Sequence, residues 1–80
     1  MRMKEAVVKR FQALCRAKGI RYNELATLSG VTPSTVYSMM DARRKDVSVV
    51  TVKKLCDGLS VSIPDFFNDP VFGTLEQEIS

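Results

Sequence analysis

The chain has 80 residues, of which 12 are lysine or arginine and 9 are aspartate or glutamate, and it carries a formal net charge of +3. This length allows one compact domain and leaves little scaffold for a large catalytic cleft. Because histidine is absent and only two cysteines occur, the commonest general base and a closed zinc site are excluded, and we expect no enzyme, metal or cofactor.

The first predicted helix covers residues 4–18. Its apolar residues recur at helical spacing and are Val7, Phe11, Leu14 and Cys15. Gly19 follows it and offers the left-handed backbone that commonly ends a helix. A shorter second helix is expected at Tyr22–Ser29, with Leu25 and Ala26 on its inner face.

The third predicted helix runs over about Pro33–Met40. Thr32 is a capping hydroxyl and Pro33 stands at the first helical position, which together make a strong start signal. Val36 and Met39 are three residues apart, so we expect both to face the core.

A polar loop over residues 41–47 separates this helix from a fourth one at 49–59, which Ser48 caps. The apolar stripe of the fourth helix consists of Val52, Leu55, Cys56 and Leu59. Ser62 caps a short fifth helix that contains Ile63, Phe66 and Phe67. Five short helices with brief connections predict an all-α bundle around one core.

The two cysteines, Cys15 and Cys56, both lie inside apolar helical patterns. We expect buried free thiols that pack like small hydrophobic groups; a mutual disulfide is the weaker alternative. The N-terminus lacks the apolar core of a signal peptide, and no stretch approaches the ~20 apolar residues of a membrane span. We therefore expect a soluble, cytoplasmic protein without a membrane partner.

The segment from Glu24 to Met39 requires two short helices joined at an angle by a tight turn. Ala26 is small enough for the third helix to approach the second, and Gly30 permits positive φ in the turn. The outer face of the third helix carries hydroxyl groups and no carboxylate. A helix of this kind fits the major groove of DNA, which is about 12 Å wide.

Residues 20–67 resemble the phage-repressor/Cro-type helix-turn-helix family, also called xenobiotic-response-element-type regulators. The resemblance rests on Leu25-Ala26, Gly30-Val31 and Ser34-Thr35-Val36, and on the later segments 48–59 and 61–67. It implies a compact five-helix fold of the lambda-repressor-like kind and binding to double-stranded DNA.

The resemblance also implies which residues touch bases from the third helix. Carried over to this sequence, these residues are Thr32, Pro33, Ser34, Thr35 and Ser38, with Tyr37 adjacent. Pro33 stands where a polar residue is common, so its contact should be apolar, for example to a thymine methyl. Three other positions also depart from the family pattern, namely Arg21, Tyr22 and Met40; the Tyr22 hydroxyl can still reach a phosphate.

Basic residues surround the predicted recognition helix. Arg43, Arg44 and Lys45 follow it directly and are expected to contact phosphates; the alternative is a solvated loop. Lys18 and Arg21, together with Arg16, flank the connection between the first two helices and are further candidates for phosphate contacts. The remaining cations are interpreted as ordinary solvent-facing charges and include Lys4, Lys9, Arg10, Lys53 and Lys54.

The charge is unevenly distributed. Residues 1–56 hold all twelve basic residues against four acids, a balance of +8, whereas residues 57–80 hold five acids and no base. We expect a DNA-binding domain over residues 1–68 and an acidic, apolar tail over residues 69–80. The apolar residues of this end either fold over the bundle or form a homodimer contact: Phe66, Phe67, Val71, Phe72, Leu75 and Ile79.

These patterns predict a sequence-specific transcription regulator, and specifically a repressor that reads the major groove with residues 33–40. The alternative hypothesis is an antitoxin-like or adaptor module whose tail captures a protein partner. No small-molecule ligand is indicated.

Overall fold

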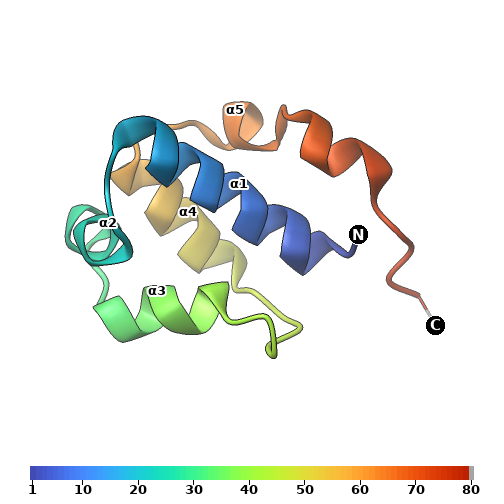
Figure 1. Ribbon diagram of the computed structural model, residues 1–80, viewed down its shortest axis with the longest axis horizontal. Helices are drawn as coiled ribbons and strands as arrows, with labels where there is room; N and C mark the ends of the chain where they lie inside the picture. Colours follow the sequence, from blue (N-terminus) through green and yellow to red (C-terminus); the bar gives the residue numbers. More distant parts are fainter. Residues whose placement is uncertain (80) are drawn as a thin grey trace.

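The computed structural model describes residues 1–79, and these form helices joined by short loops without any β-strand. In chain order the elements are α1 (Met3–Lys18), α2 (Tyr22–Ser29), α3 (Pro33–Met40), α4 (Val49–Gly58), α5 (Ile63–Phe67) and the 3-10 helix η1 (Pro70–Thr74). In Figure 1, α3 runs along one side of the molecule and α5 with η1 along the opposite side, with α1 and α4 between them. The predicted all-α fold with five α-helices is confirmed.

The helix boundaries follow from local capping. The hydroxyl oxygens of Thr32, Ser48 and Ser62 accept hydrogen bonds from the backbone amides three residues later, at the starts of α3, α4 and α5. Gly19 and Gly30 follow α1 and α2 with φ of 65° and 68°, the left-handed conformation that ends a helix. These caps depend on residues within a few positions, which explains why the sequence predicted the boundaries closely.

The core is built from the apolar positions that the helical spacing predicted. Its fully buried large side chains come from the five α-helices and from the C-cap of α4, and are Val7, Phe11, Leu25, Val36, Leu55, Cys56, Leu59 and Phe66. The rings of Phe11 and Phe66 have centroids 4.5 Å apart, which joins α1 to α5. Burying an aliphatic or aromatic side chain of this size contributes about 1.5–3 kcal/mol, so these contacts provide most of the driving force for folding.

Both cysteines are buried free thiols, as predicted. Desolvation by burial is the main cause that raises the pKa of Cys15 and of Cys56 above the ordinary value of a thiol. Met39 is buried, as predicted, and Met3 and Met40 pack at the edge of the core. Between residues 1 and 79, no helix is both long and apolar enough to cross a membrane.

The prediction that the side chains of Lys4 and Arg10 face solvent is wrong. Lys4 is only 7% exposed, and its Nζ donates hydrogen bonds to the backbone carbonyls of Asp41 and Arg44. Arg10 donates to the carbonyls of Asp65 and Phe66 and forms an ion pair with Asp69. Both acceptor sets lie far away in the sequence, so the helical pattern of α1 gave no sign of them. The other cations of this group are exposed as predicted: Lys9, Lys53 and Lys54.

The C-terminal segment packs against the rest of the chain. Val71, Phe72 and Leu75 are half-buried, and the Phe72 ring lies 5.8 Å from that of Phe66. Further on, Glu78 accepts a hydrogen bond from the backbone amide of Met3. Ile79, in contrast, is 87% exposed.

Candidate nucleic-acid interface

The outward face of α3 carries the residues predicted to touch bases. Pro33, Ser34 and Tyr37 are exposed, as is Thr32 at the cap, while Thr35 and Ser38 are half-buried. Val36 and Met39 occupy the opposite face of the helix and are buried in the core. The polar side of α3 is therefore turned away from the bundle, and none of its own residues carries a carboxylate.

Hydroxyl groups at the start of α3 form a connected cluster. The Thr32 Oγ1 lies 3.1 Å from Ser34 Oγ and 3.0 Å from Thr35 Oγ1, and it accepts a hydrogen bond from the Thr35 amide. Each hydroxyl can both donate and accept, so the cluster retains hydrogen-bonding capacity toward an external partner. The cap thus stabilises the helix and also fixes the side chains that face outward.

A shallow hollow of about 310 Å³ adjoins α3 and is completed by distant parts of the chain. Its lining includes Ser34, Thr35 and Ser38 of α3, Arg44 and Asp46 of the following loop, and the N-cap Ser48 and Thr51 at the start of α4. The α4 residues were not among the predicted site residues. Only the tertiary structure brings them close to α3. In the sequence, Ser48 predicted the start of a helix but not its position beside α3. Asp46 contributes one carboxylate to the lining of this hollow, which Arg44 also lines.

The loop after α3 projects three cations into solvent. Arg43, Arg44 and Lys45 are all exposed. The Arg43 guanidinium pairs with the Asp41 carboxylate at 2.9 Å, and these hydrogen bonds from Arg43 lower the pKa of Asp41 to about 2. Arg44 and Lys45 form no ion pair with any residue in the described part of the chain. Two of the three predicted loop cations are thus fully available to an anion.

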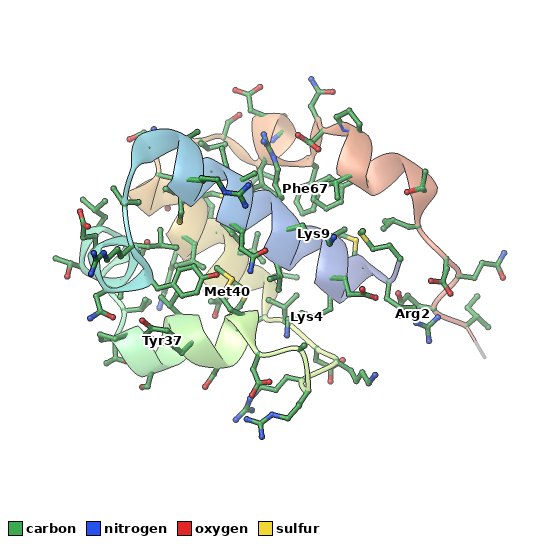
Figure 2. The ribbon with its side chains drawn as sticks, viewed as in Figure 1. Arg2, Lys4, Lys9, Tyr37, Met40 and Phe67 are labelled. Atoms are coloured by element: carbon green, nitrogen blue, oxygen red, sulfur yellow. The ribbon has the colours of Figure 1, made fainter. Side chains whose placement is uncertain are left out.

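Aromatic and basic residues meet where α2 begins. Tyr22 is half-buried, and its ring packs edge-on against that of Tyr37 with centroids 5.4 Å apart. The hydroxyl oxygen of Tyr22 accepts a hydrogen bond from Gln12 Nε2. Arg21, Tyr22 and Tyr37 border a second open hollow, and Lys18 is exposed near the end of α1. Tyr37 is exposed, so it can shield this junction or contact a ligand; Figure 2 shows it on α3.

Arg21 stands at the N-cap of α2, where a hydroxyl is usual in such domains. The Arg21 side chain makes no capping hydrogen bond, but Glu24 accepts one from the Arg21 amide at 3.4 Å through its Oε1. This is one half of a capping box, and it stabilises the helix start without a serine or threonine. With arginine in place of the usual hydroxyl residue, the guanidinium of Arg21 is exposed at the positive end of α2.

Comparison with known proteins agrees with this geometry. Residues 10–70 match the family model of the Cro/C1-type HTH DNA-binding domain. The crystal structure of the prophage Lp1 protein 11 is 32% identical in sequence and superposes with a TM-score of 0.80, covering 94% of this chain and 100% of that one. No curated protein matches the chain.

The family match extends over most of the chain, from the middle of α1 to η1, and includes the whole of α2, the turn and α3. It bears out the predicted resemblance and the expectation that the chain binds DNA and is not an enzyme. The chain belongs to the Cro/C1-type helix-turn-helix DNA-binding family.

Proposed function

We propose that this protein is a sequence-specific transcription regulator that represses by occupying operator DNA. One observation carries the proposal: the exposed side of α3 holds hydroxyl groups without a carboxylate, and exposed cations lie beyond its end. Such a helix inserts into the major groove with its N-terminal residues toward the base edges.

Sequence readout is assigned to the start and the outer side of α3. The proposed base-contacting residues are Thr32, Pro33, Ser34, Thr35, Tyr37 and Ser38. Serine and threonine hydroxyls bond either donors or acceptors, so they require their neighbours to fix orientation, and the hydroxyl cluster around Thr32 supports this. Pro33 is assigned an apolar contact.

Phosphate contacts are assigned to both ends of this surface. At the α2 side they involve Lys18, Arg21 and Tyr22, and at the loop side Arg43, Arg44 and Lys45. Such contacts fix the position of the protein on the duplex without carrying sequence information. Because Arg43 shares its guanidinium with Asp41, we assign the larger electrostatic contribution to Arg44 and Lys45.

We also propose that the protein acts in the cytoplasm and binds DNA as a homodimer. Small domains of this kind occupy paired half-sites about 34–36 Å apart, which mirrors a twofold axis. Within the proposed division of the chain into residues 1–68 and 69–80, the tail is assigned to packing. The half-burial of Val71, Phe72 and Leu75 supports that role over capture of a protein partner.

Selection of bound duplexes from a random DNA pool tests the proposal. The expected result is one enriched motif, repeated as an inverted pair if the protein dimerises. With six phosphates contacted, the slope of log K against log salt should be about −5. Failure to enrich any motif, or an affinity independent of salt, would contradict the proposed function.

A further inference from the structure

Lys4 lies in an environment that is unusual for a lysine. It belongs to the first turn of α1, yet its side chain is almost fully buried. Its Nζ donates to the Asp41 carbonyl at 3.1 Å and to the Arg44 carbonyl at 2.9 Å, across 37 and 40 positions of sequence. Figure 2 shows Lys4 extending from α1 toward the loop that follows α3.

This placement is unfavourable for α1 itself. A cation near a helix N-terminus opposes the helix dipole, and burying an ammonium group is costly without partners. The stabilising effect of Lys4 falls on α3 instead. The last turn of α3 contains no basic residue, and Asp41 is its C-cap, so Lys4 supplies from another helix the cation that this end lacks.

Lys4 also joins the two ends of the turn that carries the loop cations. The Asp41 carbonyl accepts from the Arg44 amide at 3.1 Å and closes the turn, while the Asp41 carboxylate accepts from the Arg43 amide at 2.9 Å. Lys4 binds the first and the last carbonyl of this turn. Its ammonium group therefore fixes the turn against α1 and sets the direction in which the chain leaves it toward Lys45.

We propose that Lys4 is a positioning residue for DNA binding: it holds the loop of residues 41–45 at the end of α3, so that Arg44 and Lys45 reach phosphates while α3 occupies the groove. This inference rests on the proposed function. Because the Lys4 ammonium is buried and directed at two carbonyls, it acts through the loop rather than by touching the phosphates itself.

Arg10 provides a matched control on the same helix. It is also a partly buried cation that donates to two backbone carbonyls, but these belong to Asp65 and Phe66 of α5. Figure 1 places α5 on the side of the molecule opposite α3. Lys4→Met and Arg10→Met each remove one anchored cation while keeping an apolar stem. Lys4→Met removes the anchor of the loop after α3, whereas Arg10→Met removes the anchor of α5 and also the ion pair with Asp69.

The experiment compares both variants with the wild-type protein on the duplex selected from the random pool, over a series of salt concentrations. We expect Lys4→Met to bind about tenfold more weakly near 0.1 M salt, with the slope reduced by about 1–2 because one or two phosphate contacts are lost. The order of base preferences should stay unchanged. Arg10→Met should lower the melting temperature and leave the slope at its wild-type value.

A double-variant cycle separates positioning from a direct contact. In an Arg44→Ala/Lys45→Ala background, Lys4→Met should cause no further change in slope, because the residues that it positions are gone. An equal reduction in both backgrounds, or a folded Lys4→Met protein with the wild-type slope, would overturn the proposal. If the wild-type protein itself binds no duplex, the proposed function fails instead.

A measurement on the wild-type protein covers the case in which Lys4→Met does not fold. The Lys4 ammonium should give a slowly exchanging nitrogen-15 signal with couplings to the two carbonyls, and the signal should stay in place when the selected duplex is added. A fast-exchanging ammonium, or a signal that moves strongly on DNA binding, would refute positioning.

Discussion

Gly58 of α4 lies directly against Ser29 of α2, so that a Cβ atom at position 58 would stand 2.2 Å from the Ser29 Oγ and 3.0 Å from its backbone nitrogen. Only a residue without a side chain allows α2 and α4 to approach this closely. The contact matters for the candidate interface because α2 in turn packs against α3 and fixes its angle. The Ser29 Oγ itself is buried and has no hydrogen-bond partner in the described part of the chain.

We expect Gly58→Ala to destabilise the protein by about 1–3 kcal/mol, the usual cost of overpacking a tight contact. Chemical denaturation measures this loss. Gly73→Ala is the matched control, since a Cβ there meets nothing within 4 Å and its φ is not left-handed. Adding Ser29→Ala to Gly58→Ala removes the 2.2 Å contact and should recover part of the loss. Equal stability of the two alanine variants would contradict the steric argument.

Gly30 is required for a different reason. A Cβ at this position would meet no atom within 4 Å, but the φ of +68° is left-handed. We expect Gly30→Ala to cost about 1–2 kcal/mol through backbone conformation alone. Gly30→Asn should cost less, because asparagine tolerates this region better. Thermal unfolding of the two variants distinguishes them, and an asparagine variant less stable than the alanine variant would refute the explanation.

Ser34 and Arg44 should have separable roles in DNA binding. Ser34→Ala is expected to weaken discrimination at one base pair by up to about tenfold while the salt slope stays constant. Arg44→Ala should weaken binding to all sequences alike and reduce the magnitude of the slope by about 0.9. Titrations against the selected duplex and its single-base variants measure both effects. Lys54→Ala removes an exposed cation of α4 outside the proposed interface and serves as the charge control.

The Asp41–Arg43 pair predicts a dependence of stability on pH. Hydrogen bonds from Arg43 lower the pKa of Asp41 from 3.8 to about 2, so the folded state binds the proton less tightly than the unfolded state. The contribution is therefore present above pH 3.8 and is lost as the pH falls toward 2. Because the pair is solvent-exposed, we expect a small effect that salt weakens.

Melting curves between pH 2 and 5 measure this contribution. The decrease in melting temperature over this range should be smaller for Asp41→Asn and for Arg43→Met than for the wild-type protein, since each variant lacks one partner. If the melting temperature decreases as much in both variants as in the wild-type protein, the pH dependence arises from other carboxylates.

The C-terminal segment should contribute to folding through Phe72. Its ring lies 5.0 Å from Phe67 and is half-buried, so Phe72→Ala should cost about 1–2 kcal/mol, less than the ~3–5 kcal/mol of a fully buried phenylalanine. Ile79→Ala changes an exposed apolar residue and should stay within about 0.5 kcal/mol of the wild-type protein. Urea unfolding compares the two, and the reverse order would favour a role of Ile79 in contacts that the monomer does not make.

The sequence by itself determined the five α-helices and which face of α3 is exposed. Gly30, in the left-handed conformation, ends α2, and Thr32 with Pro33 starts α3, through interactions that span only a few residues. The spacing of Val36 and Met39 decides which face of α3 is buried. The same spacing left Ser34 and Tyr37 outside, so the candidate surface on α3 was predictable.

Only the tertiary structure decided what surrounds that surface. Lys4 is anchored to carbonyls 37 and 40 positions away and Arg10 to carbonyls 55 and 56 positions away, so the pattern within α1 assigned both wrongly to solvent. Thr51 and Asp46 likewise reach the α3 hollow through the packing of separate elements. Local capping and periodicity are encoded within a turn or two, whereas a buried cation finds its acceptors only after distant backbone has been brought together.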